Sequence, residues 1–179
     1  AFVDEYRNQF AAMYPSLRDN EDYTAIINER QYERLQGYLD DAREKGAELI
    51  EINPASENLK DGTRKMPITL VLKTTPDMKI MQDEIFGPIL PIISYGNLDE
   101  AIHYINDRPR PLALYFFGYD KSMQEHVVNQ THSGGMCIND ALMHVAQDDL
   151  PFGGIGDSGM GHYHGKEGFL TFSHQRAIF

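Results

Sequence analysis

Residues 89–139 alternate between short apolar runs and amphipathic runs, and this alternation constrains the fold more than any other feature. The apolar runs have the length of buried strands, and the runs between them have the three-to-four spacing of helices. The strands are expected at Ile89–Tyr95, Leu112–Gly118 and Gly135–Asn139, and the helices at Leu98–Asn106 and Lys121–Thr131. Strands joined by crossover helices pair in parallel, with right-handed connections. The sequence therefore predicts the α/β class, with a largely parallel sheet covered by helices.

The residues before this alternation predict two more helices and two more strands. Apolar residues recur at helical spacing in Phe2–Met13, and a longer helix is expected from Asn28, a good capping residue, to Gly46, a good terminator. Ala47–Ile52 is short and apolar, and Met66–Thr75 alternates between apolar and polar residues. Both patterns are typical of strands.

The residues after the alternation form a glycine-rich stretch, Pro151–Gly168, followed by Phe169–Phe179, which alternates like a strand. The chain begins inside one periodic pattern and stops inside another, whereas the ends of domains are commonly polar and irregular. We therefore expect the chain to be a piece of a longer protein.

Acidic residues dominate the charged positions: 27 Asp and Glu stand against 16 Lys and Arg, for a formal net charge of −11. Such a chain repels nucleic-acid phosphates and anionic membrane surfaces, so nucleic acid is not expected as a partner. No apolar run reaches the length of a membrane span. Cys137, the single cysteine, excludes an intramolecular disulfide and fits a reducing compartment. A cytoplasmic location is the simplest expectation.

The segment Gln82–Pro88 carries the most chemical information. Its acidic residues, Asp83 and Glu84, stand directly before an aromatic residue, Phe86, and a Gly-Pro break that opens a strand. An ionised Glu can accept hydrogen bonds from both hydroxyl groups of a ribose, and a neighbouring Phe offers a flat apolar wall to a nicotinamide ring. The alternative is a capping carboxylate beside a core Phe, because such turns are common before buried strands.

Several motifs in the same order as in a known family support the first interpretation. They are Glu84–Pro88 (EIFGP), Ser133–Asp140 (SGGMCIND), Leu150–Gly154 (LPFGG), Gly156–Lys166 (GDSGMGHYHGK) and Thr171–His174 (TFSH). With these motifs the chain resembles the C-terminal part of the aldehyde dehydrogenase superfamily, and the resemblance covers nearly the whole chain. The last two motifs are similar to those of the branch that holds fatty, aromatic and coniferyl aldehyde enzymes. The resemblance implies NAD- or NADP-dependent oxidation of an aromatic aldehyde, such as coniferyl aldehyde, or of a medium- or long-chain aliphatic aldehyde. It also implies that residues 1–168 are a portion of the catalytic domain.

The resemblance also implies roles for four side chains. Glu84 would bind the ribose next to nicotinamide, Phe86 would line the nicotinamide ring, and Gln31 would touch the cofactor. Phe152 would lie on the wall of the aldehyde tunnel. Two of these roles have an ordinary structural alternative, because a helical Gln is commonly a solvated side chain and Phe152 could anchor a glycine-rich turn. Arg34 falls where the family often has a basic residue.

The resemblance places the catalytic thiol and the general-base Glu in chain that precedes this segment, so no catalytic residue is expected here. Cys137 lies between Met136 and Ile138 in an apolar strand, whereas a reactive cysteine needs an electropositive, partly exposed setting. We interpret Cys137 as a buried structural residue. The chain alone is therefore predicted to be inactive.

Two other motifs are interpreted as structural. Gly154–Gly159 satisfies the dinucleotide fingerprint GxGxxG, but Pro151 precedes it and too little chain follows for a βαβ unit. We expect a loop in which the glycines permit positive φ and close backbone approach. His162 and His164 could chelate a metal ion from one side of a strand, but no third ligand is evident, so local hydrogen bonding is expected and a metal is not.

The C-terminal run is the last candidate for function. In the resembling enzymes such a segment pairs with a partner subunit, which implies that Phe169–Phe179 is an interface strand and that the protein self-associates through Thr171–Phe179. The alternative is a strand in the chain's own sheet. Two further functional classes stay open: a thiol hydrolase built on Cys137 and a histidine, and a non-catalytic binding or assembly module.

Overall fold

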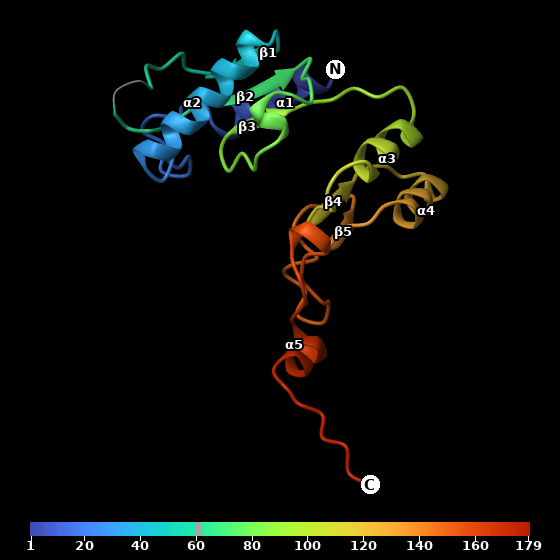
Figure 1. Ribbon diagram of the computed structural model, residues 1–179. Helices are drawn as coiled ribbons and strands as arrows, with labels where there is room; N and C mark the ends of the chain where they lie inside the picture. The colour runs from blue at the N-terminus through green and yellow to red at the C-terminus, as the bar shows by residue number, and fades with distance from the viewer. Residues whose placement is uncertain (60–61) are drawn as a thin grey trace. The chain divides into compact units, whose positions relative to one another are not determined.

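The computed structural model describes residues 1–59 and 62–179, which form two compact units, Ala1–Ser94 and Tyr95–Phe179 (Figure 1). Both units combine helices with a small sheet, so the α/β class is confirmed. Among the helices that lie in the described ranges, none is long and apolar enough to cross a membrane.

The first unit begins with the two helices that the periodicity predicts, α1 (Phe2–Met13) and α2 (Glu29–Glu44). The Asn28 side chain caps α2 by accepting a hydrogen bond from the backbone N–H of Gln31 at 3.0 Å. Gly46, just after the helix, has a φ of +87°, a conformation that a residue without Cβ adopts without strain.

A three-stranded sheet lies between these helices. The strand β2 (Ile68–Leu72) pairs antiparallel with β1 (Glu48–Ile52) and parallel with β3 (Ile89–Pro91). Successive side chains of a strand point to opposite faces, and Leu70 packs with the α1 residues while Val71 packs with the α2 residues. The two helices therefore cover opposite faces of the sheet, which explains why the centre of β2 is fully buried.

The third strand is shorter than the predicted Ile89–Tyr95. The paired residues of β3 end at Pro91, and one further hydrogen bond joins the two strands, from the Ile92 N–H to the Val71 carbonyl at 2.9 Å. Tyr95, the last residue of the predicted strand, lies beyond β3 and is exposed. The turn that leads into β3 follows a short 3₁₀ helix, η1 (Lys79–Met81), which the sequence patterns did not predict.

The second unit contains the predicted strand–helix–strand arrangement. Its elements are α3 (Leu98–Asn106), β4 (Ala113–Phe116), α4 (Lys121–Gln130) and β5 (Gly135–Ile138). The two strands are parallel, with Ala113 opposite Gly135, as expected for strands joined by a crossover helix. Asn97 and Asp120 cap the two helices through their side chains.

The end of the chain differs from the predicted strand Phe169–Phe179. The helix α5 (Gly165–Thr171) includes its first three residues, and residues 172–179 are in neither helix nor strand. The side-chain hydroxyl of Thr171, the last residue of the helix, donates to the Glu167 carbonyl at 2.9 Å. A strand needs a neighbouring strand for its backbone hydrogen bonds, so alternation alone does not produce one in a single chain. Pairing of this segment with a second copy stays a prediction.

Candidate functional site

The turn Gln82–Pro88 lies directly between η1 and β3. Its middle residue, Ile85, is partly buried against the core that α2 shares with the sheet. The flanking residues Glu84 and Phe86 are exposed, and Phe86 has 82% of its surface accessible. Phe86 also adopts a φ of +52°, which is unusual for a bulky side chain. The turn therefore presents a carboxylate and an aromatic ring on either side of an apolar anchor.

The three residues expected to bind cofactor line one cavity of about 1000 Å³ in the first unit. Gln31 reaches it from the first turn of α2, and Glu84 and Phe86 reach it from the turn. The remaining lining is mostly aromatic and aliphatic and includes Phe10, Tyr14, Tyr23, Ile26 and Ile27. The structure thus brings together residues that are more than fifty positions apart.

Arg34 attaches the turn to α2. Its guanidinium donates to the carbonyl oxygens of Glu84 at 3.0 Å and Ile85 at 2.5 Å. The same group donates to the Gln31 side-chain oxygen at 2.7 Å and to the Tyr38 hydroxyl at 2.7 Å. Gln31, Arg34 and Tyr38 share one face of the helix because they are three and four positions apart. The sequence marked Arg34 only as a basic position and missed this role.

Gly87 lets the turn approach the same helix. A Cβ atom placed there would lie 2.5 Å from a methyl group of Leu35, which is fully buried in the core. This close approach excludes any larger residue unless the core shifts, so the Gly-Pro break identified in the sequence has a packing function as well as a turn function.

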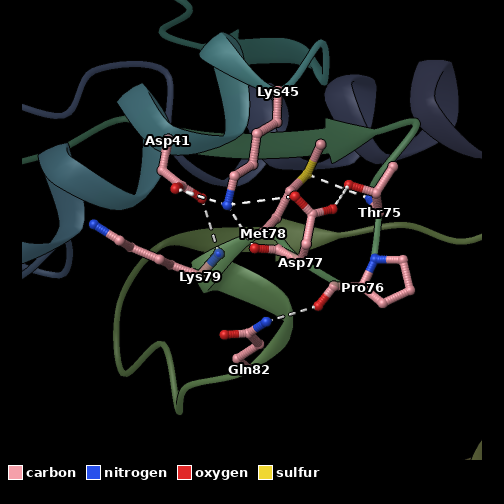
Figure 2. Close-up of polar contacts among 8 residues, drawn as sticks. All are labelled: Asp41, Lys45, Thr75, Pro76, Asp77, Met78, Lys79 and Gln82. Carbon is pink, nitrogen blue, oxygen red and sulfur yellow. Dashed lines mark hydrogen bonds and ion pairs between the residues drawn. The ribbon is translucent and has the colours of Figure 1, made fainter.

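A second group of polar contacts holds the segment just before the turn (Figure 2). Asp41, in the last half of α2, accepts from the backbone N–H of Lys79 at 2.9 Å and pairs with the Lys45 ammonium at 3.0 Å. Lys45 also donates to the Asp77 carbonyl at 2.5 Å, and Thr75 donates to the Asp77 carboxylate at 2.5 Å. The hydrogen bond from Lys79, followed by those from Lys45, lowers the pKa of Asp41. These contacts fix η1 and therefore the start of the turn.

Tyr23 belongs to a group of aromatic residues that lines the same cavity. Its ring lies edge-on to Phe10, with centroids 6.0 Å apart, and to Tyr14, with centroids 5.5 Å apart. The Tyr23 hydroxyl donates to the Met66 carbonyl at 2.6 Å. Burial, with smaller contributions from the charges of Tyr6 and Tyr14, raises the pKa of Tyr23 from 10.0 to about 12.

This raised pKa predicts an alkaline loss of stability. The unfolded chain releases the Tyr23 proton near pH 10, whereas the folded chain keeps it to about pH 12, so the contribution of Tyr23 is complete below pH 10 and is lost between these values. We expect the free energy of unfolding, measured by urea titration, to fall less steeply over this interval in Tyr23→Phe. Tyr119→Phe is the control, because Tyr119 is 91% exposed and should leave the slope unchanged. Equal slopes in Tyr23→Phe and the parent chain would contradict the assignment.

In the second unit Phe152 forms an antiparallel bridge with Tyr163, with both backbone hydrogen bonds at 2.9 Å. Its ring contacts three others, His144, Tyr163 and His164, with centroids 5.7 to 6.1 Å apart. This position agrees with the structural alternative, a Phe that anchors the glycine-rich segment, and does not test a place in a substrate tunnel.

Cys137 has a histidine partner that the sequence did not identify. Its sulfur lies 3.2 Å from Nδ1 of His144 and accepts the backbone N–H of His144 at 3.3 Å. Both side chains are 8% exposed, which agrees with the prediction that Cys137 is buried. A thiol hydrolase would need a substrate carbonyl to reach the sulfur, so this burial opposes that alternative.

The remaining motifs are local structure. Within Gly154–Gly159 the structure places only a three-residue 3₁₀ turn, η2 (Gly156–Ser158), where a dinucleotide fingerprint would need the start of an α-helix. His162 pairs with Glu167 at 2.8 Å, in agreement with the expected local hydrogen bonding. Among the residues that the structure describes, no group of three His, Cys, Asp or Glu side chains could hold a metal ion.

Comparison with known proteins is consistent across the whole chain. The model of the aldehyde dehydrogenase family matches residues 1–178. A probable coniferyl aldehyde dehydrogenase of Pseudomonas aeruginosa is 59% identical over 99% of this chain and 36% of the relative, and the coniferyl aldehyde dehydrogenase of a Pseudomonas species is 52% identical over 99% and 37%. The substrate-bound AldH of Staphylococcus aureus superposes with a TM-score of 0.85 at 42% identity, over 96% of this chain and 36% of that one. An NAD⁺ complex of a Bacillus cereus aldehyde dehydrogenase gives a TM-score of 0.70 at 25% identity, over 80% and 28%.

Proposed function

The chain belongs to the aldehyde dehydrogenase family, and from this premise we propose that the whole protein oxidises aldehydes to carboxylic acids with NAD or NADP as the hydride acceptor. The chain spans 36% to 37% of the length of the coniferyl aldehyde dehydrogenases that it matches. Their names support an aromatic aldehyde such as coniferyl aldehyde as the substrate, with a medium- or long-chain aliphatic aldehyde as the alternative.

One observation carries the proposal for this chain: Gln31, Glu84 and Phe86 line a single cavity. The exposed Glu84 carboxylate can accept from both hydroxyl groups of the ribose next to nicotinamide, and the exposed Phe86 ring can cover one face of the nicotinamide. Gln31 can contact the cofactor from the first turn of α2. When bound, the nicotinamide accepts the hydride, and the residues of this chain fix its position relative to the aldehyde.

Phe152 and the C-terminal segment have proposed roles in the same protein. We assign Phe152 to the wall of the aldehyde tunnel, where a partly buried ring among other aromatic rings suits an apolar substrate. We assign Thr171–Phe179 to self-association. Its large apolar side chains support this, since Phe172 and Ile178 are 91% and 81% exposed and a partner chain would remove them from water. A non-catalytic assembly module is the alternative function, and the same exposed segment favours it.

The proposal predicts that this chain and the whole protein behave differently. The whole protein should produce reduced nicotinamide from NAD or NADP with coniferyl aldehyde or a long-chain aliphatic aldehyde. The 179-residue chain should produce none, because its one thiol is buried beside His144 and the catalytic pair is expected in the preceding chain. The absorbance of reduced nicotinamide measures the activity of the whole protein and of the 179-residue chain. Activity of the short chain that disappears in Cys137→Ala would overturn the assignment, and an inactive whole protein would favour the assembly module.

A further inference from the structure

We propose that the hydroxyl of Tyr38 and the carboxylate of Asp83, together with Arg34, form a lock that sets the position of Glu84. The proposal rests on the function proposed above, because it gives these residues a purpose in orienting the nicotinamide ribose. Tyr38 and Asp83 touch no reacting atom in this scheme, so they are positioning residues.

The lock ties three consecutive residues of the turn to one face of α2. The Tyr38 hydroxyl donates to the Asp83 carboxylate at 2.9 Å and accepts from Arg34 at 2.7 Å. Arg34 in turn donates to the carbonyl oxygens of Glu84 and Ile85. Asp83 is therefore held by its side chain and the next two residues by their backbone, which leaves the Glu84 side chain free to line the cavity.

The arrangement also balances charge. The Arg34 guanidinium bonds to carbonyl, amide and hydroxyl oxygens, all of them neutral acceptors. The Tyr38 hydroxyl connects it to the Asp83 carboxylate, and hydrogen bonds to charged groups are stronger than neutral ones. A hydroxyl with a cation on one side and an anion on the other is polarised in one direction, so its orientation is fixed.

The conformation of the turn explains why such a lock is needed. Phe86 has a positive φ and an exposed ring, so neither backbone preference nor burial of that ring holds it. Ile85 contributes an apolar anchor, but an apolar contact does not fix direction. Backbone hydrogen bonds hold the two ends of the turn, from the Asp83 N–H to the Lys79 carbonyl at 3.0 Å and from the Thr69 N–H to the Pro88 carbonyl at 2.8 Å. The hydrogen bonds from Arg34 and Tyr38 add directional contacts to Asp83, Glu84 and Ile85, from a helix whose own core residues are fully or nearly fully buried.

Tyr38→Phe in the full-length protein tests the lock, because the ring is 6% exposed and its core packing is kept while the hydroxyl is removed. We expect the Kd for NAD, measured by calorimetry, to rise about tenfold, the effect of one hydrogen bond to a charged group. In turnover we expect a higher KM for NAD, a larger isotope effect with deuterated aldehyde, and an unchanged KM for the aldehyde. Asp83→Ala should give the same changes, and the double variant should be no worse than either single variant.

Two further variants separate positioning from folding. Asp83→Asn keeps an oxygen that accepts from Tyr38 and should restore most of the affinity that Asp83→Ala loses. Tyr32→Phe removes a hydroxyl elsewhere on α2, from a ring that packs partly against the same core, and should bind NAD like the parent protein.

Two outcomes would contradict the proposals. If the parent protein oxidises aldehydes, and both Tyr38→Phe and Asp83→Ala bind NAD as tightly as the parent protein, the lock is overturned and the proposed function is kept. A parent protein that neither oxidises aldehydes nor binds NAD would overturn the proposed function and the lock together.

Discussion

Glu84→Gln in the full-length protein is expected to slow hydride transfer about a hundredfold, because misplacing a bound reactant by as little as 1 Å can cost this much. The amide has the same shape as the carboxylate, but it has one acceptor oxygen and a donor group in place of two acceptors. The amide can therefore no longer accept one hydrogen bond from each ribose hydroxyl through each of its two terminal atoms. Without this pair of hydrogen bonds the nicotinamide should turn away from the aldehyde. The rate of reduced nicotinamide formation in a single turnover measures the step.

The control for this change is Glu44→Gln, the same substitution at an exposed position near the far end of α2. Its single-turnover rate should equal that of the parent protein. An unchanged rate in Glu84→Gln would refute the proposed role of Glu84. A loss confined to the Kd for NAD, with hydride transfer intact once the cofactor is saturating, would also refute it, because that pattern indicates uniform binding without orientation.

The elements of the fold were predictable because their signals are local. Asn28 and Gly46 mark the two ends of α2, and the crossover between β4 and β5 follows from apolar runs separated by an amphipathic one. The errors occur where the decisive contact is not local. The third strand ends early because only Ile89–Pro91 pair with β2. Residues 172–179 are in neither helix nor strand, and their pairing with a second copy stays a prediction.

The candidate site was predictable only in part, for the same reason. Glu84 and Phe86 stand beside a Gly-Pro break, so the sequence itself marks them. No local pattern identifies the side chains that support them, because their contacts join distant parts of the sequence. Tyr38 and Asp83 are separated by 45 positions, and Arg34 and the Ile85 carbonyl by 51. Helical spacing places Gln31, Arg34 and Tyr38 on one face of α2, but only the tertiary fold shows what that face meets.

Cys137 illustrates the same division between local and tertiary information. Its apolar neighbours on β5 correctly predicted burial. Its partner could not be chosen among the seven histidines, because His144 lies in irregular chain after the strand and periodicity says nothing about where such a segment returns. A cysteine next to a histidine is thus insufficient to indicate a nucleophile, and the 8% exposure of both residues opposes that role.

Gly154→Ala is expected to destabilise the protein by about 3 kcal/mol, at the upper end of the usual cost of overpacking. A Cβ atom on Gly154 would lie 2.1 Å from the Ser158 carbonyl oxygen and 2.6 Å from the Gly159 nitrogen, so the obstacle is backbone that cannot rotate away. Hydrogen bonds between Ile155 and Ser158, at 2.9 and 3.0 Å, hold that backbone in place. The free energy of unfolding from urea titration measures the loss. Gly168→Ala, in α5 with its nearest neighbour 3.9 Å away, is the matched control and should stabilise slightly.

The same variant distinguishes a packed loop from a dinucleotide fingerprint, which are the two explanations of the glycines between residues 154 and 159. A fingerprint glycine permits close approach to a pyrophosphate, so its replacement would weaken NAD binding while the free energy of unfolding stayed unchanged. A packing glycine gives the opposite result, a loss of stability with NAD binding retained in the molecules that remain folded. The backbone contacts of Gly154 and the three-residue turn at Gly156–Ser158 favour packing, so weakened binding without destabilisation would reverse this interpretation.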